Sequence, residues 1–242
     1  MTDKLSELRE EIDRLDNEIL AALQARWRLS GEIIKAKNGQ TAFRPGREAD
    51  VVHRLIEALP NSDRDGIPNT VILGIWRQIF SASIAQQDAN IEIAIVDPCL
   101  PAALWHFGSS MTLSPYNSAA AAVAAIGNSA RYAMVPCDLA DELAAILWDR
   151  DDLFVIARTP LFAVDAIAPS YIIGPHLPDQ SNADEMLYAV KQPDGVVFRS
   201  HQKTGAKKTA APTTGGDDTL GDNVGDNVKL IGMAALAQPR SK

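Results

Sequence analysis

The chain has 242 residues, 46% of them hydrophobic, and its 31 acidic and 23 basic side chains give a formal net charge of −8 at pH 7. This length and apolar content suffice for two small globular cores, so we expect two domains. The net negative charge argues against nucleic acid and against an anionic membrane as partners, because binding to either needs clustered exposed cations.

The two cysteines, Cys99 and Cys137, lack the CxxC or Cys/His spacing of a metal site. We therefore expect no metal, a reducing cytoplasmic location, and two thiols that act as small buried apolar groups. The first residues, MTDKLSELREE, lack the apolar core of a signal peptide, and no uninterrupted apolar run approaches the ~20 residues of a membrane span. The sequence thus predicts a soluble protein.

Residues 5–36 are expected to form one long helix. Apolar or small side chains recur there at alternating spacings of three and four, the pattern of a coiled-coil-like seam. The seam consists of Leu5, Leu8, Ile12, Leu15, Ile19, Ala22, Leu29, Ile33 and Ala36. Such a helix is roughly 50 Å long at 1.5 Å per residue, too long for two short helices of the same chain to cover. We therefore expect a second copy of the chain to cover it in a homodimer.

Two shorter helices should follow. The second is expected from about Gly46 to Leu59, between Pro45 and the turn sequence PNSDRDGIP, and the third from about Asn69 to Gln87. The apolar face of the third helix is expected to hold Ile72, Ile75, Trp76, Ile79 and Phe80. Residues 1–90 are therefore interpreted as an all-α three-helix domain.

After residue 90 the pattern changes to short apolar runs that alternate with alanine-rich helical segments. The expected strands are 91–98, 112–115, 131–135, 153–158 and 171–174, and the expected helices are 100–108, 117–127 and 138–148. This order predicts a small α/β domain over residues 91–200, and thus an α+β multidomain chain. Residues 201–228, rich in Gly, Thr, Asp and Lys, predict a flexible segment, and residues 229–242 a returning edge strand with a tail.

Arg26 occupies a seam position between Ala22 and Leu29, where an apolar residue would be buried. An unpaired buried guanidinium is costly, so Arg26 should meet an anion, either within the protein or on a ligand. Lys37 follows 11 residues later, about 16 Å away on nearly the same side of the helix, so both side chains could converge on one ligand. Arg9 precedes Arg26 by 17 residues, or about 25 Å, so it could reach that ligand only from a partner chain.

A second group of candidates lies on the shorter helices. Arg47 stands at the start of the second helix, where free backbone N–H groups and a planar guanidinium suit a carboxylate, and Glu48 would accept a hydrogen bond from a ligand hydroxyl. Ser83 and Gln87 lie four residues apart on one face of the third helix, and both can donate uncharged hydrogen bonds. Each residue alone is more often part of a solvated surface, so the prediction depends on their joint occurrence.

The three helical segments also carry a set of motifs. These are an LRxxID start, an Arg in the first helix, a KAK end, an RPxRE helix start and a C-terminal Ser/Gln pair, within LREEIDRLDNEILAALQARWRLSGEIIKAK, FRPGREADVVHRL and IWRQIFSASIAQQ. Over residues 5–87 the sequence thereby resembles the all-helical chorismate mutase family, which implies an intertwined helical dimer. The family's active-site roles then fall on Arg9 of the opposite protomer, Arg26, Lys37, Arg47, Glu48, Ser83 and Gln87, with Gln86 as the alternative if the third helix is one residue out of register.

The resemblance implies that the substrate is chorismate, a dianion that rearranges within the molecule to prephenate in phenylalanine and tyrosine biosynthesis. The reaction breaks a C–O bond and makes a C–C bond without a nucleophile, a metal or a cofactor. Two carboxylates must be gripped so that the enolpyruvyl arm folds over the ring. Arg9 and Arg26 are expected at the side-chain carboxylate, Arg47 and Ser83 toward the ring, and Glu48 at the ring hydroxyl.

Lys37 and Gln87 are assigned to the ether oxygen of the substrate. Negative charge grows on this oxygen as the C–O bond stretches, so preorganised donors there lower the barrier. A glutamine amide donates its N–H at any ordinary pH, so we expect no requirement for acid.

From IEIAIVDP through YAMVPC the chain resembles the first lobe of prephenate dehydratase, with HFG and YAMVP as the best-matching stretches. The catalytic signatures of that family are missing: VDPCLPAA replaces a GPxGTxS turn, CDLA replaces ENS, and FVIARTPLF carries no Thr-Arg-Phe. We therefore expect a dehydratase-derived domain without dehydratase activity, kept for stability, dimer support or ligand sensing. Three alternatives stay open: an isochorismate pyruvate-lyase on the same scaffold, a bifunctional mutase and dehydratase, and a regulatory protein that binds chorismate without turnover.

Overall fold

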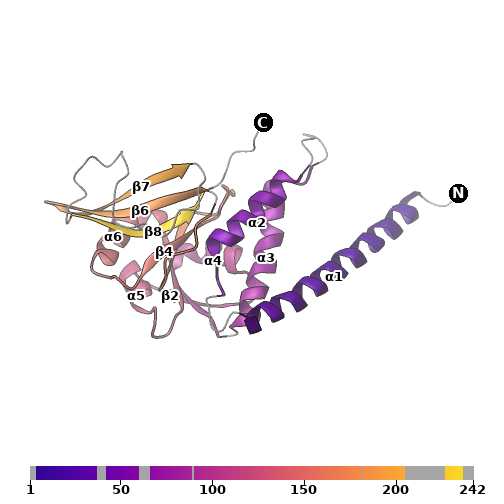
Figure 1. The fold of residues 1–242 in the computed structure, drawn as a ribbon, viewed down its shortest axis with the longest axis horizontal. Helices are drawn as coiled ribbons and strands as arrows, with labels where there is room; N and C mark the ends of the chain where they lie inside the picture. Colours follow the sequence, from indigo (N-terminus) through magenta and orange to yellow (C-terminus); the bar gives the residue numbers. More distant parts are fainter. Residues whose placement is uncertain are drawn as a thin grey trace.

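The computed structural model describes residues 4–36, 42–59, 66–88, 90–181, 183–204 and 227–236. Three helices come first, and a mixed sheet with helices on both faces follows (Figure 1). The predicted α+β organisation, with helices at the N-terminus and an α/β part after them, is confirmed.

The first helix, α1 (Lys4–Ala36), extends away from the rest of the molecule, and its C-terminal half lies nearest α3 (Figure 1). The large apolar side chains of the predicted seam are about half exposed, from 44% at Leu15 to 64% at Leu29. The seam is thus an exposed apolar surface in the single chain.

Helices α2 (Pro45–Glu57) and α3 (Asn69–Gln87) pack against each other. Proline fits the first turn of α2 because its fixed φ suits a helix and the N–H that it lacks would have no partner inside the helix. The shared core contains Val52, Ile56, Leu73 and Phe80. The helix α2 begins one residue earlier and ends two residues earlier than the sequence pattern predicts.

The apolar face of α3 differs in part from the prediction. Ile72 and Phe80 are buried as expected, but Ile75 is 47% exposed, whereas Leu73 and Ile84 are buried. The helix packs against α2 and also against α4, so its buried stripe turns toward both neighbours.

The sheet has eight strands in the order β2-β1-β3-β5-β4-β8-β6-β7. They are β1 (Glu92–Val96), β2 (Thr112–Tyr116), β3 (Tyr132–Pro136), β4 (Phe154–Thr159), β5 (Ser170–Gly174), β6 (Ala183–Gln192), β7 (Gly195–Thr204) and β8 (Val228–Ala235). Strand β1 pairs in parallel with β2 and β3, and β4 pairs in parallel with β8, while the other neighbours are antiparallel.

Helices cover both faces of the first strands. The core that includes α5 (Ala119–Ala124) and α6 (Ala140–Trp148) contains Ala94 and Val96, and the core that includes α4 (Leu100–Phe107) contains Ile93 and Ile95. Alternate side chains of β1 are therefore buried on opposite faces, which explains its continuous apolar run. Short 3₁₀ turns, Asp97–Cys99 and Cys137–Leu139, precede α4 and α6.

The C-terminal strands correct three predictions. Strands β6 and β7 form a hairpin that is not among the predicted strands, and most side chains of β7 are exposed or half-buried, so its apolar pattern is weak. The returning strand is confirmed as β8, but it lies between β4 and β6 and is not an edge strand. The predicted flexible segment is wrong at both ends, since residues 201–204 complete β7 and Val228 begins β8, while residues 205–226 lie outside the described residues.

Candidate active site at the junction of the three helices

Arg26 of α1 and Ser83 of α3 are brought together across the helix junction. The Arg26 Nη1 donates a hydrogen bond of 2.7 Å to the Ser83 Oγ, and the guanidinium carbon lies 5.8 Å from the centre of the Phe80 ring. Burial lowers the pKa of Arg26, and the charge of Glu48 opposes that shift. No carboxylate of the described residues lies within ion-pair distance of Arg26, so its charge is available to an anionic ligand.

Glu48 at the start of α2 forms a buried ion pair with Arg77 of α3. The Arg77 Nη1 donates to the Glu48 Oε2 at 2.7 Å, and both side chains are less than a tenth exposed. Burial raises the pKa of Glu48 to about 7, although the charge and hydrogen bond of Arg77 act in the opposite direction. Burial likewise lowers the pKa of Arg77, against the effect of Glu48.

Arg77 is absent from the predicted site, although the sequence carries a signal for it. It lies on the buried stripe of α3, four residues after Leu73 and three before Phe80. A cation among apolar positions is the same signal that identifies Arg26 in the seam of α1, and it predicts a buried anionic partner.

Asp179, in the loop after β5, contacts the N-terminus of α2. Its Oδ2 accepts a hydrogen bond of 3.1 Å from the Arg47 backbone N–H and lies 3.2 Å from the Arg44 Nη2. A Cβ at Gly46 would lie only 2.1 Å from the Asp179 carbonyl oxygen, so only glycine allows this close approach. The carboxylate stabilises the helix end by satisfying a free N–H and opposing the positive end of the helix dipole. The Arg47 side chain itself is exposed.

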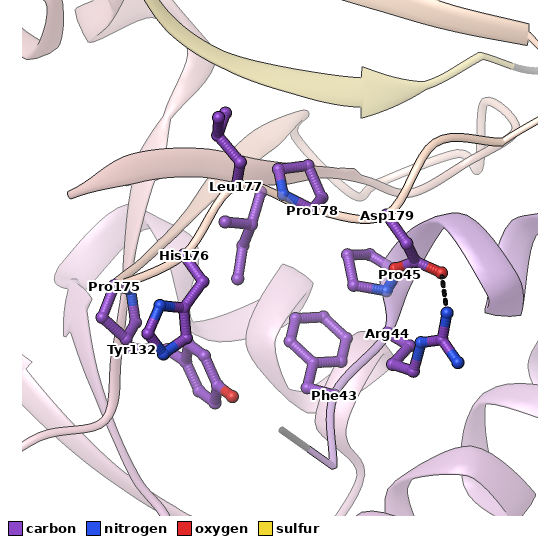
Figure 2. Close-up of a pocket in the computed structure, with 10 residues that line it drawn as sticks. Phe43, Arg44, Pro45, Tyr132, Pro175, His176, Leu177, Pro178 and Asp179 are labelled. Atoms are coloured by element: carbon purple, nitrogen blue, oxygen red, sulfur yellow. Dashed lines mark ion pairs between the residues drawn. The ribbon is translucent and has the colours of Figure 1, made fainter. Parts of the chain in front are cut away.

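A cavity of about 530 Å³ lies between this loop and the chain that leads into α2 (Figure 2). Phe43, Tyr132 and His176 point toward its interior, and the Arg44–Asp179 ion pair stands at one side (Figure 2). None of the predicted site residues lines it. The cavity is therefore separate from the Arg26–Ser83 junction.

The remaining predicted residues are Arg9, Lys37 and the two glutamines at the end of α3. Arg9 is exposed on α1, and Lys37 lies outside the described residues. The Gln87 Nε2 donates to the Ser83 carbonyl oxygen at 3.1 Å. The neighbouring Gln86 lies against α1, since a Cβ built on Gly31 would lie 3.7 Å from its Nε2, and its buried Oε1 has no hydrogen-bond partner among the described residues. Both glutamines therefore remain candidates for a role at the site.

The carboxyl ends of β1 and β3 hold the two cysteines. The Cys99 Sγ donates to the Ser170 Oγ at 3.4 Å, and burial raises the pKa of both Cys99 and Cys137 to about 11. Thiols with such pKa values are poor nucleophiles near neutral pH.

Within the described part of the chain, no group of three or more His, Cys, Asp or Glu side chains could hold a metal ion. Across the described helices, none is long and apolar enough to span a membrane.

Comparisons with known proteins identify a family for the helical segment. Residues 8–88 match the family Chorismate mutase type II. The chain is 32% identical over 119 residues to the bifunctional chorismate mutase/prephenate dehydratase of Aquifex aeolicus (strain VF5). The aligned segment covers 47% of this chain but only 33% of that protein. The chain thus spans about a third of the length of this relative. No solved structure matches. The predicted resemblance is therefore confirmed for the helical segment, since residues 8–88 match the family Chorismate mutase type II.

Proposed function

We propose that this protein is a chorismate mutase that rearranges chorismate to prephenate. The observation that carries the proposal is the half-buried Arg26, which is held by Ser83 and has no carboxylate partner among the described residues, within a segment that matches the mutase family. A guanidinium held in a partly desolvated site is suited to bind a substrate carboxylate with two parallel hydrogen bonds.

The reaction needs orientation and charge stabilisation from the protein. Arg26 and Lys37, 11 residues apart in the sequence, would grip the dianion between them, with Arg47 and Ser83 toward its ring. Glu48 uses Oε2 for Arg77, and its other oxygen would accept a hydrogen bond from the ring hydroxyl. Lys37 and a glutamine of α3, Gln87 or alternatively Gln86, would donate to the ether oxygen as its charge grows.

The functional unit of the proposal is a homodimer with shared sites. The seam of α1 leaves large apolar side chains about half exposed, which favours coverage by a second copy of the same helix. Arg9 lies 17 residues before Arg26, about 25 Å along the helix, so it would enter the site of the partner subunit. The two free cysteines are compatible with the cytoplasm as its location.

A second candidate activity is dehydration of prephenate by the α/β part. The name of the Aquifex relative favours it, because that protein is called bifunctional. The sequence argues against it, since the GPxGTxS, ENS and Thr-Arg-Phe signatures are absent. We favour a mutase without dehydratase activity.

The test is conversion of chorismate by the purified full chain and by two arginine variants. Arg26→Ala should lower kcat/KM by roughly 100-fold or more, because the site loses the guanidinium that donates to the substrate carboxylate. Arg54→Ala is the matched control, since Arg54 is exposed on α2, and it should retain wild-type turnover. If the wild-type protein converts chorismate no faster than the uncatalysed reaction, the proposal is contradicted.

A further inference from the structure

A buried polar chain connects the helical segment to the α/β part. The Arg77 Nη1 donates to the Glu48 Oε2 at 2.7 Å and also lies 3.4 Å from the Nε2 of His106 on α4. The Nδ1 of His106 is 2.9 Å from the Thr159 Oγ1 at the end of β4. All four side chains are buried, with exposed fractions from 1% at Thr159 to 7% at Glu48.

The tautomer of His106 follows from its two partners. A guanidinium can only donate, so Nε2 must carry the lone pair that accepts from Arg77. The Nδ1 of a neutral ring then carries the hydrogen and donates to Thr159. Burial and the charge of Arg77 hold the pKa of His106 well below its ordinary value, which agrees with a neutral ring.

Aromatic side chains fix the orientation of this ring. Phe43, just ahead of α2, meets it edge-on with the ring centres 5.6 Å apart, and Phe107 meets it at 4.7 Å. Because rotation of the imidazole would break its contacts with both Arg77 and Thr159, this packing helps to keep the polar chain in one arrangement.

We propose that Arg77 is the positioning residue for Glu48, and that His106 of the α/β part, itself held by Thr159, keeps Arg77 in place. This inference rests on the proposed mutase function, in which Glu48 accepts a hydrogen bond from the substrate. The α/β part thereby completes the mutase site without touching the substrate. The α/β part contributes one oriented hydrogen-bond acceptor, the Nε2 of His106, to the Arg77 that pairs with Glu48.

Glu48 depends on Arg77 because the environment otherwise favours its neutral form. Burial is the largest effect and opposes ionisation, as does the charge of Asp179 from the loop after β5. The cations that oppose burial are Arg77 of α3 and, more weakly, Arg26 of α1, whereas the facing His106 is neutral. Without Arg77, Glu48 would keep its proton to a higher pH and would no longer be fixed in direction.

A double-mutant cycle in the full chain tests whether Arg77 acts through Glu48. Arg77→Met should lower kcat at pH 7 by about tenfold or more and move the acid limb of its pH profile upward, because fewer Glu48 side chains are ionised. Glu48→Gln should also have a low kcat, but its pH profile should lack the acid limb, because glutamine does not ionise. If Arg77 acts through Glu48, the double variant should be no slower than Glu48→Gln within about twofold. Multiplicative losses, or an Arg77→Met profile with an unchanged acid limb, would overturn the proposal.

His106 is tested by a matched pair of variants. His106→Gln keeps one acceptor and one donor and should retain most of kcat, whereas His106→Leu removes both and should lose about tenfold. The exposed His176→Leu is the control and should behave as wild type. Equal activity of the Leu and Gln variants at His106 would contradict a role for its hydrogen bonds.

A direct titration separates this inference from the function on which it rests. Carbon-13 NMR of labelled glutamate carboxyls, with the Glu48 signal assigned by its loss in Glu48→Gln, reports the Glu48 pKa without turnover. Both Arg77→Met and His106→Leu should raise it, and His106→Gln should raise it less. If the titration is the same in all folded variants, the positioning role fails even if the protein is a mutase. If it shifts as expected but chorismate is not converted, the proposed function fails alone.

Discussion

Arg26 of α1 and Ser83 of α3, 57 residues apart in the sequence, are joined by a 2.7 Å hydrogen bond at the junction of the helices. Ser83 also donates to the Ile79 carbonyl oxygen of its own helix at 2.9 Å, so its hydroxyl has a fixed direction. Arg26 is thereby oriented before any ligand arrives, which reduces the entropy lost on substrate binding.

The first prediction concerns this hydrogen bond. Ser83→Ala should lower kcat/KM for chorismate by about five- to twentyfold, because Arg26 keeps its charge but loses its orientation. Arg26→Lys should be worse, since a lysine cannot present two parallel donors to a carboxylate. Steady-state kinetics would check both, with the exposed Ser110→Ala as the control. Wild-type kinetics for Arg26→Lys would be inconsistent with a forked contact.

The second prediction identifies the glutamine that faces the ether oxygen. Gln87→Glu should keep substrate binding but lose turnover at pH 7 and above, because a carboxylate replaces a donor, and lowering the pH should restore part of the rate. Gln86→Glu should show little change. The reverse pattern would assign the role to Gln86, which lies against α1 near Gly31. A pH–rate profile that is unchanged in both variants would remove this face of α3 from the active site.

The third prediction concerns the shared site. Arg9→Ala and Arg26→Ala should each be nearly inactive as homodimers, whereas subunit exchange between them should restore about a quarter of wild-type activity. Half of the dimers would then be mixed, and one of the two sites in each would hold both arginines. Differently tagged subunits allow the mixed dimer to be isolated and assayed. An inactive purified mixed dimer would refute sharing of Arg9 between subunits.

The fourth prediction links Glu48 to stability. Its folded-state pKa, about 7, lies above the ordinary value of 4.5, so its contribution is fully present below pH 4.5 and is lost as the pH rises through 7. Relative to Glu48→Gln, the wild-type chain should therefore lose on the order of 2 kcal/mol of unfolding free energy between these pH values. Urea unfolding at several pH values measures this difference. If the wild-type chain instead gains unfolding free energy relative to Glu48→Gln as the pH rises, Glu48 is stabilised as a carboxylate.

The helices and the first five strands follow from local sequence patterns. The three-four spacing of apolar residues predicts α1, and the short apolar runs predict β1, β3, β4 and β5, because burial on both faces removes most polar positions from a strand. The hairpin of β6 and β7 escapes this reasoning, since most side chains of β7 are exposed or half-buried. The position of β8 between β4 and β6 depends on contacts across long sequence separations, which no local pattern carries.

Part of the candidate site is also encoded locally. The misfit of Arg26 in an apolar seam predicts a cation that meets an anion, whereas the structure gives it the neutral hydroxyl of Ser83 as its partner. The contacts of Asp179 with α2 and of His106 with Arg77 join segments that are distant in the sequence, so neither could be predicted from spacing. Both come from the α/β part, which makes that part structurally continuous with the helical site.

The most direct test of the mutase assignment is the identity of the product formed from chorismate. Proton NMR of a reaction with the purified full chain should show prephenate as the sole enzymatic product, with no pyruvate and no phenylpyruvate above the rate without protein. Phenylpyruvate would show that the α/β part is an active dehydratase, and release of pyruvate from isochorismate in a parallel reaction would indicate a lyase. Bound but unchanged chorismate would contradict the central claim that this chain is a mutase.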